Sequence, residues 1–175
     1  MSGSEGTRAG FEEFVAARRA ALLRTAYLLT GDHHEAEDLV QVALVRCVGH
    51  WAKIAADPEP YVRTVLARES VTRWRRRRWR EVSVALPELA AAEMANDDRV
   101  TLHAALARLS PRQRAVVVLR YYEDLTETET ARALGISAGT VKSHARDALA
   151  RLRQLVPGLD ADEHTGVLTR SRGSR

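Results

Sequence analysis

A run of arginines in the first half of the chain carries the most obvious potential for chemistry. Six of the eight residues from 73 to 80 are Arg and the other two are Trp. So dense a row of guanidinium groups repels itself unless an anionic surface lies beside it, and Arg binds phosphate oxygens in a bidentate geometry. The run therefore predicts contact with nucleic-acid phosphates. A solvated basic tail or a helix on a membrane surface is the alternative, although the run lacks the apolar face that membrane binding requires.

A second group of polar side chains is expected on one face of a helix over 138–154. Apolar residues at helical spacing define its inward face, namely Val141, Ala145, Ala148, Leu149 and Leu152. The outward face carries small or polar residues with cations and a histidine at its edges, namely Gly139, Thr140, Ser143 and Asp147, flanked by Lys142, Arg146, His144 and Arg151. Small residues at a helix start allow close approach to base edges, while flanking cations hold phosphates. The pattern is typical of a helix that reads DNA.

The turn before this helix would position it. Gly135 suits a left-handed conformation, and the spacing of Ala131, Gly135 and Val141 fits two helices that cross at a helix-turn-helix. A generic helical hairpin with a glycine turn is the alternative. Capping residues at Ser110, Thr126 and Ser137 predict helices over 111–122, 127–134 and 138–154.

In the first half, Thr30-Gly31 ends one helix, and Asp32 with Glu35 reads as the N-cap of the next. Seven apolar residues form one predicted core stripe on that second helix, namely Leu39, Val40, Ala43, Leu44, Cys47, Val48 and Trp51. The outward face carries Asp38, Gln41, Val42 and Val45. A face that mixes Val with Asp and Gln suits a protein partner better than solvent, and packing inside the same helix bundle is the alternative. A further helix starts at Pro60 and runs into the arginines.

Charge divides the 175 residues into blocks. Residues 1–80 carry a net charge of +4 and residues 97–156 a net of +3, whereas residues 81–96 carry −3 and contain Pro87. We therefore expect domains over 1–80 and 97–156, a linker over 81–96, and a disordered tail over 157–175. Nothing reads as a strand ladder, so the fold class is all-α, with two small helical domains joined by a short linker.

The amino-acid composition limits the classes of protein to which the chain can belong. Of 27 basic residues 25 are Arg, which permits nucleic-acid binding, although a GC-rich genome would give the same bias. One cysteine excludes an intrachain disulfide and a multi-cysteine zinc site, and no leader or membrane-spanning run is present, so we expect a cytoplasmic protein.

Enzymatic function is disfavoured by the same sequence. Cys47 lies in an apolar stripe, where thiols are usually inert. The acids and histidines around His33 are neighbours on a helix, so their side chains point about 100° apart and cannot readily share one metal ion. The sequence also contains no glycine-rich phosphate-binding loop. We expect no catalytic residue, no metal and no cofactor.

Four segments in order resemble an extracytoplasmic-function sigma factor of the sigma-70 superfamily, over residues 11–156. These are HHEAEDLVQVALVRC, PYVRTVLARESVTRWRRRRWR, LSPRQRAVVVLRYYEDLTETETARALGIS and AGTVKSHARDALARLR. The resemblance implies a subunit that joins core RNA polymerase, recognises the −10 and −35 promoter elements and directs transcription initiation. It also implies that an anti-sigma factor is a possible partner.

The resemblance assigns contacts to positions of this chain. The core polymerase would contact Asp38 and Gln41, on the same outward face as Val42 and Val45. Residues 52–60 match the loop that captures a flipped −10 base, and the −10 helix would present Arg63, Arg68, Thr72, Arg73, Arg76 and Arg77. The −35 helix would present Ser137, Thr140, Lys142, Ser143, His144 and Arg146. His144 departs from the Arg that is frequent at this position in the family.

A free-standing regulator of the LuxR type is the alternative function, because TVKSH also suits the recognition helix of that family. Such a regulator usually carries a sensing domain and would footprint duplex DNA alone, whereas a sigma factor requires core polymerase.

Overall fold

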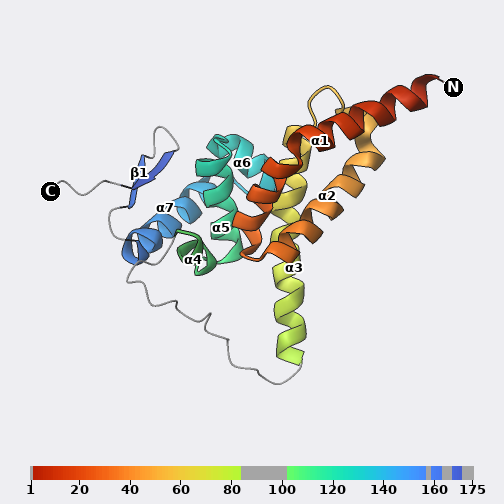
Figure 1. Ribbon diagram of the computed structural model, residues 1–175. Helices are drawn as coiled ribbons and strands as arrows, with labels where there is room; N and C mark the ends of the chain where they lie inside the picture. Colours follow the sequence, from red (N-terminus) through yellow and green to blue (C-terminus); the bar gives the residue numbers. More distant parts are fainter. Residues whose placement is uncertain (1, 84–101, 157–158, 163–166, 171–175) are drawn as a thin grey trace.

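The computed structural model describes all residues except 1, 84–101, 157–158, 163–166 and 171–175, with side chains for 8–77, 102–156 and Leu159. Within these ranges the chain forms seven α-helices, one π-helical turn and one pair of short strands (Figure 1). The helices are α1 (Ser2–Thr30), α2 (His33–Ile54), α3 (Glu59–Ser83), α4 (Leu102–Ala107), α5 (Pro111–Val117), α6 (Glu127–Leu134) and α7 (Ala138–Leu155). The π-helical turn η1 (Val118–Tyr122) follows α5 directly, and strands β1 (Leu159–Asp162) and β2 (Val167–Arg170) follow α7.

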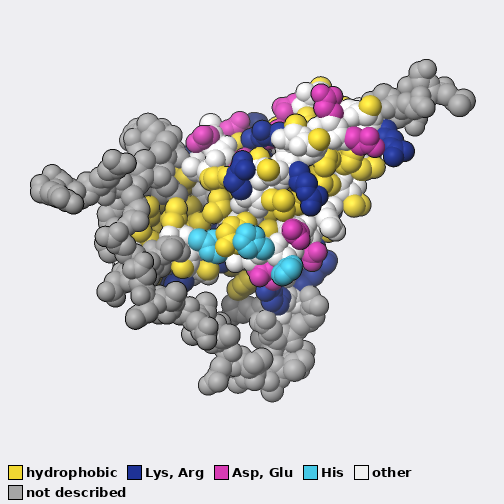
Figure 2. Space-filling view, in the orientation of Figure 1, with side chains coloured by type: hydrophobic (Ala, Val, Ile, Leu, Met, Phe, Trp, Pro, Cys, Tyr) yellow, Lys and Arg dark blue, Asp and Glu magenta, His cyan; other side chains and the backbone are white. Residues whose placement is uncertain are grey.

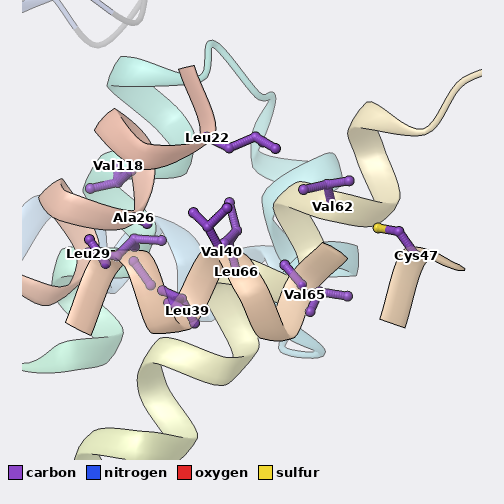
Figure 3. Close-up of a cluster of buried hydrophobic side chains, with 13 residues drawn as sticks. Leu22, Ala26, Leu29, Leu39, Val40, Cys47, Val62, Val65, Leu66 and Val118 are labelled. Atoms are coloured by element: carbon purple, nitrogen blue, oxygen red, sulfur yellow. The ribbon is translucent and has the colours of Figure 1, made fainter. Parts of the chain in front are cut away.

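Helices α1–α3 form a first unit. The turn between α1 and α2 follows from the local sequence. Gly31 ends α1 with a φ of 83°, which favours glycine. Asp32 then caps α2, because its carboxylate accepts a hydrogen bond from the Glu35 backbone N–H at 2.9 Å. The core between the helices is built from Leu39, Cys47 and Leu66, all with no exposed area (Figure 3).

Residues 102–156 form a second unit, in which the predicted caps are present. Ser110 and Thr126 each accept a hydrogen bond from the backbone three residues later, at 3.3 and 3.2 Å, and Gln113 and Glu129 complete both capping boxes. Gly135 adopts a φ of 67° at the end of α6, as the helix-turn-helix prediction requires.

The two units share one continuous core. Ala115 and Val118 of the second unit are buried in the cluster built mainly by α1, α2 and α3, and Figure 3 places Val118 near Ala26 and Leu29. Beyond this contact, the C-terminal part of α3 projects away from the other helices (Figure 1). The all-α class with two helical domains is confirmed.

Four local expectations need correction. Val48 does not join the core stripe of α2 but is 57% exposed. The carboxylate of Glu35 was expected to support the N-cap of α2, but it pairs with Arg77 across the α2–α3 contact at 2.5 Å. The helix expected over 111–122 changes to π-helical hydrogen bonding at Val118. The helix expected from Pro60 begins one residue earlier, at Glu59.

Residues 157–175 were expected to be disordered, and the structure corrects this for two stretches. Strands β1 and β2 pair antiparallel, with Leu159 opposite Arg170 and Asp162 opposite Val167. Leu159 is 5% exposed and packs in the cluster that contains Leu152 and Val156, which gives the segment an apolar anchor. The expected linker falls outside the described residues from 84 onward. No helix in the described part of the chain has the length and apolarity needed to cross a membrane.

Candidate polymerase and DNA contact surfaces

The outward face of α2 is open to a partner over most of its length. Asp38 and Gln41 are exposed, and Val42 is half-buried. Val45 is 72% exposed, and with Val48 it adds an uncovered apolar surface next to the acid and the amide. This combination of branched apolar and polar side chains is suited to a protein interface.

Two arginines of α3 that are predicted to contact DNA lie against the second unit in the structure. Arg63 donates from Nε to a carboxylate oxygen of Glu123 at 2.6 Å. Arg68 donates from Nε to the carbonyl of Ala133 at 2.6 Å and from Nη2 to the carbonyl of Arg132 at 2.9 Å. Both arginines are thus engaged in the arrangement that the structure describes.

The remaining predicted residues of α3 lie against α2, in solvent or at a groove between the two units. Arg77 pairs with Glu35, and the Nη2 of Arg73 lies 3.4 Å from the carbonyl oxygen of Asp38. Arg76 is exposed and forms no ion pair with the described residues. Thr72 is half-buried beside a groove of about 200 Å³ between the two units. The groove is lined by Arg68, Val71, Thr72, Arg75, Arg112, Leu134 and Ile136.

The loop expected to capture a base joins α2 to α3. Within 52–60, α2 ends at Ile54 and α3 begins at Glu59. Lys53 and Asp57 are exposed there, so both are accessible from solvent.

Helix α7 separates its two faces as the sequence predicts. All five expected inward residues are buried, and Val141 has no exposed area. Ser137 caps the helix, since its hydroxyl accepts from the Thr140 N–H at 3.1 Å. Lys142, Ser143 and Arg146 border a shallow groove of about 240 Å³, which is also lined by Arg120, Tyr121, Glu127, Gly139 and Ala145.

Arg146 and His144 differ in how far they are exposed on α7. The guanidinium of Arg146 is largely exposed, and its one ion pair in the described region is a 3.4 Å contact with Asp147. His144 is half-buried, at the edge of the exposed face. The start of α7 therefore offers small polar groups and two cations to a ligand, with His144 beside them.

Arg114 is a structural residue that sequence reasoning missed. Its guanidinium is buried and donates to the carbonyls of Leu29 and Thr30, each at 3.2 Å, and to those of Leu106 at 2.9 Å and Ala107 at 2.8 Å. It thereby caps the C-terminal ends of α1 and α4 together. Burial lowers its pKa. One available signal was an arginine directly before the apolar run AVVVL.

An aromatic stack also joins the units. Tyr27 of α1 lies between His33, at a ring-centroid distance of 4.2 Å, and His103 of α4, at 4.3 Å. Figure 2 shows histidine side chains gathered among hydrophobic ones near the centre of this face. Desolvation, with smaller contributions from Arg114 and His33, lowers the pKa of His103. Its Nε2 has no hydrogen-bond partner among the described residues.

Cys47 is confirmed as a packing residue. It is fully buried, and desolvation raises the pKa of its thiol to about 11. A thiol with so high a pKa holds little of the nucleophilic thiolate near neutral pH.

Comparisons with known proteins match both units separately. Residues 14–80 match the family described as Sigma-70 region 2, and residues 105–154 match Sigma-70, region 4. RNA polymerase sigma-E factor of Streptomyces avermitilis is 44% identical over 157 residues, covering 87% of this chain and 88% of the relative. ECF RNA polymerase sigma factor SigL of Mycobacterium tuberculosis is 34% identical over 164 residues, covering 87% and 93%.

Solved structures agree with these matches. The sigma factor RpoE of Bartonella quintana, in co-crystals with the anti-sigma factor NepR, is 27% identical with a TM-score of 0.64. The match covers 83% of this chain and 95% of that one. The PhyRSL–NepR complex from Sphingomonas sp. Fr1 matches with a TM-score of 0.53 at 18% identity, which supports the fold alone.

Proposed function

The chain belongs to the extracytoplasmic-function group of the sigma-70 family, and from this premise we propose which of its surfaces make each contact of a sigma factor. Sigma factors bind core RNA polymerase and promoter DNA and direct transcription initiation as non-enzymatic subunits. The LuxR-type alternative is not supported, since the first unit matches sigma-70 region 2.

The polymerase contact is assigned to the outward face of α2, through Asp38, Gln41, Val42 and Val45. The supporting observation is that the acid, the amide and Val45 are exposed together on a helix whose opposite face is core. Desolvation of the two valines would contribute affinity, and the acid and amide would fix register through hydrogen bonds.

The −10 contact is assigned to α3. Arg76 is exposed and free to take a phosphate, and Arg73 and Arg77 lie on the same arginine-rich segment. Arg63, Arg68 and Thr72 extend this surface toward the start of α3, although they face the second unit in the structure. Phosphate contacts of this kind hold the DNA and set its register.

The −35 contact is assigned to the start of α7. The carrying observation is the separation of faces on this helix, with Val141 and Leu149 fully buried while Lys142, Ser143 and Arg146 are exposed. Ser137, Thr140 and His144 complete the proposed contact. The helix N-terminus itself attracts phosphate through its free N–H groups.

Two alanine variants test the −35 assignment. An exposed arginine can grip O6 and N7 of guanine together, a contact worth about 1–3 kcal/mol of base discrimination. We expect Arg146→Ala to relax the base preference at one −35 position. Because Lys142 would hold a phosphate, we expect Lys142→Ala to lower transcription on all promoters about equally. The measurement is run-off transcription with core polymerase from a library randomised in the −35 element.

Arg153→Ala serves as the matched control, because Arg153 is an exposed arginine in the last turn of the same helix. Its base profile and activity should equal those of the parent chain. An unchanged base profile and full activity for Arg146→Ala would show that Arg146 does not contact the −35 element.

Two coarser inferences follow from the family. We infer that the protein acts in the cytoplasm, where core polymerase works, and that an anti-sigma factor binds it. The second inference is supported by the likeness to RpoE, which was solved in complex with NepR. Fractionation of cells that carry a tagged chain tests the location, and identification of the proteins that co-purify with the tagged chain tests for an anti-sigma factor.

A further inference from the structure

Glu35 places a carboxylate beside the arginine-rich surface that we assign to −10 DNA. It lies in the first turn of α2, and its backbone N–H donates to the carboxylate of Asp32, which caps that helix. The two oxygens of its own carboxylate lie 2.5 and 2.6 Å from Nη2 of Arg77. A negative charge on a surface that binds phosphate lowers the affinity for DNA. Affinity for DNA alone therefore does not account for this acid.

The ion pair leaves part of Arg77 accessible to another ligand. The side chains of Arg77 and Glu35 are 47% and 33% exposed, so solvent reaches both groups. A guanidinium has five N–H donors, and in the described contacts Glu35 engages only Nη2. The N–H groups on Nε and Nη1 can therefore bind a phosphate while the ion pair stays in place.

The contact of Arg77 with α2 has a second contact beside it. One turn earlier on α3, Nη2 of Arg73 lies 3.4 Å from the carbonyl oxygen of Asp38. By contrast, Arg75 and Arg76 are exposed and form no ion pair with the described residues. The start of α2 therefore orients two arginines of this segment and leaves two others to solvent.

We propose that Glu35 is a positioning residue for −10 recognition, which fixes the direction of Arg77 and offsets part of its charge. This proposal rests on the proposed −10 contact of α3. With Glu35 in place, Arg77 presents its remaining N–H groups in one direction and favours one register of DNA on α3. Without Glu35, Arg77 carries an uncompensated charge on a freely rotating side chain, so it binds phosphates in several registers.

The salt dependence of promoter binding tests the charge. Holoenzyme is reconstituted from core polymerase and the full chain, and promoter binding is measured at several salt concentrations. Glu35→Ala should steepen the slope of log affinity against log salt by up to about one unit, because Arg77 then neutralises a phosphate without a competing carboxylate. Glu37→Ala is the matched control, since it removes the same charge at an exposed residue of the same helix and should leave the slope unchanged.

Base preference tests the position, and a loss of stability would not change it, because unfolding removes activity from all promoters equally. The measurement is run-off transcription by the same holoenzymes from a library randomised in the −10 element. We expect the preference at the most selective position to fall about threefold in Glu35→Ala, a coupling within the range for residues in contact. Glu37→Ala should match the parent. Equal base profiles for Glu35→Ala and Glu37→Ala would overturn the proposal, even if the slopes differ.

Arg77→Gln shows whether Glu35 acts through Arg77. We expect Arg77→Gln alone to flatten the salt slope, and the addition of Glu35→Ala to this variant to change neither the slope nor the base profile. A further change in the double variant would overturn the proposal. The −10 assignment of Arg77 fails separately, if Arg77→Gln alone has the slope and the base profile of the parent. A flattened slope for Arg77→Gln, with Glu35→Ala equal to Glu37→Ala, would overturn the positioning role and leave the −10 contact in place.

Discussion

At the scale of single residues, the position of Arg114 shows how one side chain can join two units. A buried guanidinium is costly to desolvate, and this cost is what lowers the pKa of Arg114. Four carbonyls from the ends of α1 and α4 compensate by accepting its N–H groups. Lysine has the same charge but lacks the planar fork that reaches all four oxygens.

We therefore expect Arg114→Lys to lower the free energy of unfolding by about 2–5 kcal/mol, because a charge stays buried while several carbonyls lose their donor. Urea unfolding followed by circular dichroism is the measurement. Arg112→Lys, an exposed substitution two residues earlier, should leave the midpoint unchanged. Equal midpoints for both variants would show that Arg114 is not needed to hold the helix ends.

At the scale of elements, the stack of His33, Tyr27 and His103 connects α1, α2 and α4 through ring faces. Desolvation, followed by Arg114 and His33, lowers the pKa of His103, while Glu35 acts on Arg114 and Asp32 lies close to His33. Protonation of His103 would place a second cation near Arg114 without a hydrogen-bond acceptor at Nε2. The stack is therefore stable with a neutral His103.

This arrangement predicts a loss of stability in acid. The pKa of His103 is lower in the folded chain than the ~6.5 of an unfolded histidine, so the unfolded chain binds more protons as the pH falls through that value. Stability should decrease from about pH 7.5 to about pH 5.5. His103→Phe keeps the ring stack and should lose part of this decrease, measured as the difference in urea midpoint between the two pH values. His34→Phe, at an exposed position outside the stack, should retain it fully.

The helices themselves were largely predictable, because their signals are local. Asp32, Ser110, Thr126 and Ser137 cap helices where the sequence places them, and Gly135 forms the turn. Each of these signals needs only neighbouring residues.

The packing of the two units was not predictable in the same way. The partner of Arg63 is 60 residues away and the carbonyl partners of Arg68 are 64 and 65 residues away, and backbone carbonyls leave no mark in a sequence. An arginine that meets phosphate and one that meets a helix end look identical in the sequence. The π-helical turn at Val118 was missed because an apolar run fits either winding.

At the scale of the whole molecule, the faces assigned to polymerase and to the second unit are different faces of the first unit. Asp38, Gln41 and Val45 of α2 remain exposed, whereas the guanidinium groups of Arg63 and Arg68 are hydrogen-bonded to the second unit. The outward face of α2 is therefore accessible to a protein partner in the arrangement that the structure describes.

We expect Asp38→Arg to reduce co-purification with core polymerase at least tenfold, because the new cation meets a surface that accepted an acid. Glu37→Arg makes the same charge change at the adjacent exposed residue and is the matched control. Circular dichroism should show unchanged helicity for both variants, since neither residue is core. Equal yields of polymerase with both variants would contradict the assignment of Asp38.

The capping of α1 by Arg114 also has a consequence for biosynthesis. The ribosome makes Thr30 first, and its partner Arg114 follows 84 residues later. At about 5–20 residues per second, the end of α1 waits roughly 4 to 17 seconds for its donor. Throughout this interval the apolar surface that will cover Ala115 and Val118 is bare on the nascent chain. Transiently exposed apolar surface of this kind favours aggregation, so a pause in translation between the two units would lengthen the interval in which the nascent chain is vulnerable.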